Sequence, residues 1–171
     1  MIVRSIEDAD ALMVQIASSA AHAQRWMAAQ IGYALDVLRL MKFEPVGVHP
    51  IGGHRLNLVE QINQTWTYAA AIAAARELLL LHPDAEGFSL APGAHRSQPL
   101  DIMSVRPGLV GAEAFAAVSP KNNKKLAADL AKLKTRGETH RYVFFLSPQY
   151  PIAARQISLE MSGIQVWSVR V

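Results

Sequence analysis

The spacing of apolar residues predicts helices in the first half of the chain. Between residues 9 and 41, apolar and small side chains recur at three- and four-residue intervals, which is typical of a helix. Asp8 is the expected cap, and Gly32 is the expected position of a kink, so this segment forms one helix or two. A second helix is predicted over about residues 57–82, and its alanine-rich middle indicates close packing against another element.

From residue 87 onward the pattern changes to alternating positions and short apolar runs, which indicate strands. Turn residues separate the first three runs, so we expect a three-stranded antiparallel meander. Ser119 and Pro120 are typical of the start of a helix, which then runs to about Arg136. The elements predicted for the second half are strands at 87–91, 99–105, 109–118, 141–148 and 164–169, and helices at 120–136 and 150–162.

This order of elements predicts an α/β fold in which helices cover both faces of a mixed sheet. Residues 1–45 are expected to form an N-terminal helical segment and residues 46–171 the core, within one compact domain. The N-terminal segment is apolar or small around much of its circumference, more than one core-facing stripe requires. We therefore expect it to cover a sheet face or to join a second copy in a homodimer. Trp26, Trp66 and Trp167 are expected to be core residues.

Composition narrows the class of protein. The 171 residues suit one domain, and no window approaches the roughly 20 apolar residues that a membrane span needs, so we expect no membrane partner. Charged residues precede any apolar block at the amino terminus, which argues against a secretory signal. The chain has no cysteine, which excludes disulfides and thiolate-bound zinc. We expect a cytoplasmic protein.

Charge is unevenly distributed along the chain. Residues 1–112 hold eight Lys or Arg against ten Asp or Glu, whereas residues 113–171 hold nine against four. A basic carboxyl-terminal half favours a polyanionic partner such as nucleic acid. The alternative is an ordinary solvated helix surface, and the charge pattern leaves both open.

Two carboxylates stand out in "LDIMSVRPGLVGAEAFAAV", residues 100–118. Asp101 lies near the start of one predicted strand and Glu113 lies within the next, on the far side of an Arg-Pro-Gly turn. Pairing about that turn sets residues near 101 opposite residues near 113, so we expect the two carboxylates to be close enough to share one ion. Asp101 has the alternative role of hydrogen-bonding a turn, whereas Glu113 would be costly to bury without a partner.

The element order, with acids on the second and third strands of the meander, resembles the PD-(D/E)XK nuclease superfamily over roughly residues 57–171. The resemblance implies a restriction endonuclease-like fold and a magnesium-dependent DNA endonuclease of defence or repair type. It implies that Asp101 and Glu113 bind Mg²⁺, with Glu60 of the preceding helix as an additional ligand. Magnesium suits such a site because it takes one or two carboxylates and keeps waters and substrate phosphates as its other ligands.

The sequence departs from the superfamily's Glu-x-Lys pattern at Phe115, which stands where the lysine belongs. Side-chain alternation puts Glu113 and Phe115 on the same face of the strand. An active enzyme would then need a lysine from elsewhere, and Lys124 or Lys121 on the following helix is predicted to supply it. Otherwise the protein is a catalytically inactive relative that acts as a nucleic-acid-binding or protein-interaction module.

Basic residues near the predicted site are the candidate nucleic-acid contacts. Lys121, Lys124 and Lys125 begin a predicted helix, where cations oppose the helix dipole and therefore indicate an anion nearby. They form a solvated surface if no such anion binds. His95 and Arg96 are further candidate phosphate contacts. A different hypothesis is a structural module that assembles through the N-terminal helices.

Overall fold

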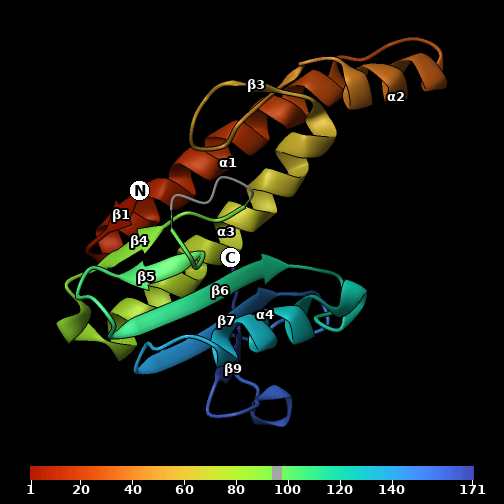
Figure 1. The fold of residues 1–171 in the computed structure, drawn as a ribbon. Helices are drawn as coiled ribbons and strands as arrows, with labels where there is room; N and C mark the ends of the chain where they lie inside the picture. Colours follow the sequence, from red (N-terminus) through yellow and green to blue (C-terminus); the bar gives the residue numbers. More distant parts are fainter. Residues whose placement is uncertain (94–97) are drawn as a thin grey trace.

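The computed structural model describes residues 1–93 and 98–171, which form an α/β structure with one large mixed sheet (Figure 1). The α-helices of the described residues are α1 (Ile6–Ala28), α2 (Ala34–Phe43), α3 (Leu58–Leu81) and α4 (Lys125–Lys134). The strands of the large sheet are β1 (Ile2–Val3), β4 (Phe88–Leu90), β5 (Ile102–Ser104), β6 (Val110–Ala116), β7 (His140–Leu146), β8 (Ala154–Arg155) and β9 (Gln165–Ser168). Strands β2 (Gly47–Val48) and β3 (Arg55–Leu56) pair separately.

The large sheet has the strand order β1-β4-β5-β6-β7-β9-β8. Strands β4, β5 and β6 form the predicted antiparallel meander, and β1 extends it at one edge. Helix α4 then connects β6 to β7, which runs parallel to β6, and β9 runs parallel to β7. The predicted mixed sheet with a helical crossover is therefore confirmed. Through β1, the N-terminal segment contributes a strand to the same sheet as the rest of the chain.

Helices cover the two faces of the sheet with separate cores. On the α3 face, the alanine-rich middle of the helix packs against alternate residues of β6, namely Val110, Ala112 and Ala114. On the α4 face, Phe115 of β6 and Val143 and Phe145 of β7 pack against the leucines of α4. This alternation means that Glu113, which lies between Ala112 and Ala114, faces α4. Small alanines allow α3 to approach the sheet closely, as the sequence indicated.

Three local predictions were wrong in physically informative ways. The cap of α1 is Ser5, whose hydroxyl accepts the backbone N–H of Asp8, while the Asp8 carboxylate accepts the backbone N–H of Ser5. Ser119 does not cap α4, because a 3₁₀ turn and two residues with positive φ, Asn123 and Lys124, precede the helix. Residues 150–162 contain strand β8 and a 3₁₀ turn (Ile157–Leu159) instead of an α-helix.

The N-terminal segment consists of two helices that separate at Gly32, where the backbone has φ of +142°. Helix α1 packs along α3, and Ala9 and Ile16 join the α3-side core. Helix α2 lies beyond the far end of the sheet (Figure 1) and has no buried residue. In the part of the chain that the structure describes, no helix is long and apolar enough to cross a membrane.

Candidate active site

The β5–β6 hairpin brings Asp101 and Glu113 together. Ile102 pairs with Ala112, and Met103 pairs with Gly111, so the next step of the register sets Asp101 opposite Glu113. Both acids line one cavity of about 650 Å³. The Asp101 Oδ2 accepts a hydrogen bond of 3.1 Å from the backbone N–H of Ala114, which fixes the carboxylate beside β6. The hairpin register thus brings both acids to one cavity, and their sharing of one ion stays a prediction.

Helix α4 brings three further charged side chains to the same cavity. Lys125, Asp129 and Lys132 are separated by four and three residues, so they lie along one face of the helix. The Lys132 Nζ forms an ion pair with Glu113 Oε1, which ties α4 to β6. The Lys125 Nζ lies 2.6 Å from Asp129 Oδ1. All three side chains line the cavity that contains Asp101 and Glu113.

The cavity holds more acidic than basic groups. Asp101, Glu113 and Asp129 face two lysines there, and no hydrogen-bond partner reaches the buried Asp129 Oδ2 from the described residues. Burial, followed by the charge of Glu113, raises the pKa of Asp101 from its ordinary 3.8 to about 7. Burial also raises the pKa of Asp129. The two lysines therefore do not balance the three carboxylates. A divalent cation bound among them would reduce the repulsion between the carboxylates.

Phe115, two residues after Glu113 on β6, packs as a core residue. Its side chain is 5% exposed, and its ring stacks on Phe145 with the two centroids 6.1 Å apart. The Lys125 Nζ lies 5.8 Å from the centroid of the Phe115 ring, a cation–π arrangement. A lysine from α4 thus lies beside the Phe115 ring, on the α4 side of the sheet. Phe115 fills the core, and the positive charge comes from the next helix.

The other predicted site residues lie elsewhere. Lys121 and Lys124 are exposed and do not line the cavity, because the 3₁₀ turn (Asn122–Lys124) and α4 direct Lys125 and Lys132 there instead. Glu60 is exposed in the first turn of α3 and lies outside the cavity lining. His95 and Arg96 fall outside the described residues. No group of three or more His, Cys, Asp or Glu suited to a metal occurs within residues 1–93 and 98–171.

Sequence reasoning missed Asp129 and Lys132, although a signal was present. These two residues and Lys125 repeat at helical spacing directly after the strand that carries Glu113. The helix was predicted, but its cap was misplaced, so the first lysines appeared to face the site. In the structure Lys121 and Lys124 precede α4, and Lys125, Asp129 and Lys132 line the cavity from one face of the helix.

Replacing Lys132 by alanine is expected to lower the free energy of unfolding in EDTA. The Glu113 side chain is 3% exposed and would lose its ion-pair partner. Because the Lys132 side chain is itself 35% exposed, we expect a cost of about 2 kcal/mol, between the values for surface and buried pairs. Urea denaturation measures it. The double variant Glu113→Gln/Lys132→Met should recover most of the stability that Lys132→Ala loses. If the double variant is destabilised as much as Lys132→Ala, the ion pair between Lys132 and Glu113 is contradicted.

No protein-family model matches this chain, and no curated protein or solved structure matches it. The fold and the cavity therefore define its class. It is an α/β protein whose mixed sheet carries two carboxylates on neighbouring strands and, on the adjoining helix, two lysines and a third carboxylate.

Proposed function

We propose that this protein is a divalent-cation-dependent phosphodiesterase of the PD-(D/E)XK type that cleaves nucleic acid, with DNA as the first substrate to test. The observation that carries the proposal is the convergence of Asp101 and Glu113, from adjacent strands, with Lys125 and Lys132 of α4 in one cavity. The meander, the crossover helix and the parallel strand support the same assignment, because they follow the element order that the resemblance implies. The basic carboxyl-terminal half suits a polyanionic substrate.

The residues present fit a magnesium ion. Asp101 and Glu113 offer the one or two carboxylates that this ion takes from protein, and the cavity leaves room for waters and a substrate phosphate. Because carboxylates outnumber lysines in the cavity, their electrostatic attraction favours binding of a cation. When bound, magnesium would lower the pKa of a water and neutralise charge on the phosphate. Glu60 is too peripheral in the described structure to be part of this proposal.

The two lysines take the role of the missing strand lysine. Lys125 and Lys132 place positive charge beside the carboxylates, where a phosphate would develop additional negative charge during attack. Replacing Lys125 by alanine is expected to slow cleavage about 100-fold, the usual cost of losing one preorganised charge. The matched changes Lys121→Ala and Lys124→Ala should stay within about twofold, because these exposed residues do not line the cavity. Single-turnover cleavage rates measure all three, and equal effects would contradict the assignment of Lys125.

The proposal is tested by incubating the purified chain with single-stranded DNA, duplex DNA and RNA in the presence of Mg²⁺, Mn²⁺ or EDTA. We expect cleavage with either metal ion and none with EDTA. Cleavage that persists in EDTA would contradict a role for a divalent cation, and no cleavage of any substrate would remove the enzymatic function.

The second candidate function is an inactive nuclease-fold protein that binds nucleic acid or another protein. Phe115 favours it, because the superfamily's lysine is replaced by a residue committed to core packing. Such a protein would bind without cutting, and binding that weakens steeply with salt would indicate phosphate contacts. Restoring the motif with Phe115→Lys is a poor rescue experiment, because it would place an ammonium group among Val143, Phe145 and Leu126.

We also propose that the chain forms a homodimer through α2. Leu35, Leu38 and Phe43 are each more than half exposed, and α2 buries none of its residues within the chain. Leu35 and Leu38 are one turn apart, so they form a continuous apolar strip. Sedimentation equilibrium is expected to give the mass of two chains, and the double change Leu35→Asp/Leu38→Asp should give one. A monomeric parent would contradict the dimer.

A further inference from the structure

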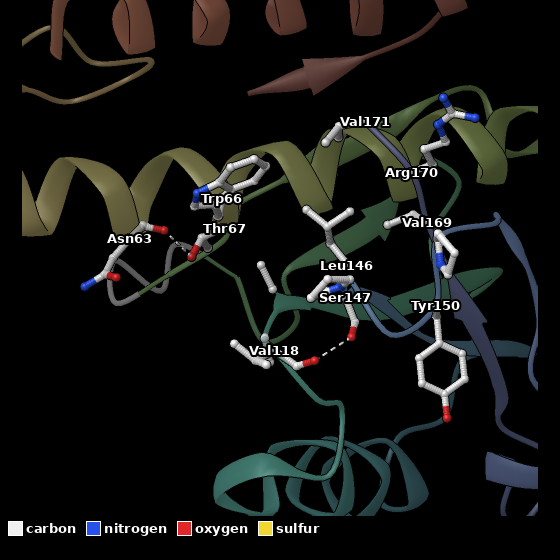
Figure 2. Close-up of a pocket in the computed structure, with 14 residues that line it drawn as sticks. Asn63, Trp66, Thr67, Val118, Leu146, Ser147, Tyr150, Val169, Arg170 and Val171 are labelled. Atoms are coloured by element: carbon white, nitrogen blue, oxygen red, sulfur yellow. Dashed lines mark hydrogen bonds between the residues drawn. The ribbon is translucent and has the colours of Figure 1, made fainter. Parts of the chain in front are cut away.

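A second cavity of about 660 Å³ lies just beyond the carboxyl ends of the three parallel strands (Figure 2). The segments that follow β6, β7 and β9 each contribute to its lining, and α3 closes it on another side. The carboxyl ends of parallel strands are where open α/β sheets generally bind ligands. Its lining includes Trp66, Val118, Leu146, Tyr150, Val169 and Arg170.

This second cavity adjoins the carboxylate cavity. Thr67 of α3 and Ala116 and Ala117 at the end of β6 line both of them. The Glu113 carboxylate lies only three residues before Ala116 along the same strand. A chain-like ligand with one unit at the carboxylates could therefore place its neighbouring unit in the second cavity.

The lining of the second cavity is mostly apolar, and it has an aromatic wall. Trp66 was expected in the core, but its side chain is 48% exposed, and it lies on the cavity side of α3 (Figure 2). Tyr150, on the segment after β7, adds a second aromatic ring, and Leu146 and Val169 line the space as apolar side chains. A large exposed aromatic next to apolar side chains suits a flat, largely apolar ligand surface.

The polar groups of the cavity suit a ligand that also carries negative charge. Arg170 is exposed and has no ion-pair partner among the described residues. Asn63 also lines the cavity, and its backbone carbonyl accepts the hydroxyl of Thr67. The combination of an aromatic wall, apolar side chains and a free guanidinium is one that single-stranded nucleic acids use, with a base on the ring and a phosphate near the cation.

We propose that the second cavity binds an unpaired base of the nucleic-acid strand whose phosphate lies at Asp101 and Glu113. Trp66 stacks on the base, and Arg170 contacts a neighbouring phosphate. A base inside a duplex has both faces covered by its neighbours, so the substrate is single-stranded nucleic acid or an unpaired end. This inference rests on the proposed phosphodiesterase for the position of the strand. Base binding itself needs no catalysis.

The test is equilibrium binding of a fluorescent 12-nucleotide single strand in EDTA, where no cleavage is expected. Because stacking of one base on an aromatic side chain contributes about 1–3 kcal/mol, Trp66→Ala should weaken binding about tenfold or more. Trp66→Phe should retain most of the affinity. Tyr33→Ala, which changes an exposed aromatic residue that does not line the cavity, should have no effect. Duplex of the same sequence should bind more weakly and should not respond to Trp66→Ala.

The outcomes separate this inference from the proposed function. Binding that depends on Trp66 in a protein that never cuts would support the base site and remove the phosphodiesterase. Metal-dependent cleavage that is unchanged by Trp66→Ala would overturn the base site and leave the enzyme. Equal loss of duplex and single-strand binding in Trp66→Ala would also overturn it, and so would failure of the parent chain to bind the single strand. Thermal melting of Trp66→Ala and Trp66→Phe checks that both variants fold.

Discussion

Replacing Asp101 by asparagine is expected to reduce metal-dependent cleavage about 1000-fold while leaving the fold intact. The asparagine side chain can still accept the N–H of Ala114, so β5 and β6 keep their contact. What is lost is the negative charge that the cavity offers to a cation, next to Glu113. Losing one preorganised electrostatic group in an active site costs up to about three orders of magnitude in rate. Single-turnover cleavage at saturating Mn²⁺ measures the loss.

The matched control for this experiment is Asp84→Asn. Asp84 is exposed and forms a surface ion pair with Arg106, away from the cavity, so its replacement should leave the rate unchanged. If Asp101→Asn cleaves as fast as Asp84→Asn, Asp101 has no part in the chemistry. Activity that remains in the preparation at the same level for every variant would indicate a contaminating nuclease.

The same substitution is expected to stabilise the metal-free protein at neutral pH. Burial and Glu113 raise the pKa of Asp101 from 3.8 to about 7, so the folded chain binds a proton that the unfolded chain releases between these values. The stability of the parent protein should therefore fall as pH rises from about 4 to 7. Asparagine is neutral throughout and avoids this loss. We expect Asp101→Asn to gain up to about 4 kcal/mol at pH 8 and close to nothing at pH 4.

Urea denaturation in EDTA at pH 4, 6 and 8 measures this difference. The difference in free energy of unfolding between Asp101→Asn and the parent should widen as pH rises. Addition of Mn²⁺ at pH 8 should narrow this difference, because the ion stabilises the parent alone. A gap that is constant with pH would show that the carboxyl titrates normally. Asp101 is then a residue that the proposed function requires although its buried charge destabilises the fold. Replacing such a residue is expected to make the protein more stable.

The sheet and its helices were largely predictable because their signals are local. Short runs of small and apolar residues indicated β6 and β7, which are buried on both faces, and the short Arg-Pro-Gly turn set the β5–β6 register. That register alone predicts that Asp101 lies opposite Glu113. The convergence of the two acids follows from the turn and the period of two, both of which the sequence displays.

The lysines of the site were harder to predict because they depend on where α4 begins. Ser119 and Pro120 are a strong start signal, but residues with positive φ at Asn123 and Lys124 delay the helix to Lys125. Lys121 and Lys124 precede the helix, so they do not follow its 3.6-residue period and do not share the face of Lys125 and Lys132. Local preference therefore favoured Lys121 and Lys124, whereas tertiary packing placed Lys125 and Lys132 over the cavity.

Trp66 shows a second limit of sequence reasoning. It follows the apolar spacing of α3, and such a residue ordinarily packs in the core. In the structure it lies where α3 extends past the carboxyl end of β6, so its neighbours leave a cavity on one side. The geometry between a helix and a sheet edge depends on contacts far apart in the sequence, and no local pattern displays it.

Titration of the metal-free chain with Mn²⁺, followed by isothermal calorimetry at pH 7.5, tests most directly whether Asp101 and Glu113 form a cation site. The parent is expected to bind Mn²⁺ at one saturable site per chain or more. The double variant Asp101→Asn/Glu113→Gln is expected to lose that site, while Asp84→Asn keeps it. A parent that binds no ion, or a double variant that binds Mn²⁺ as the parent does, would contradict the account.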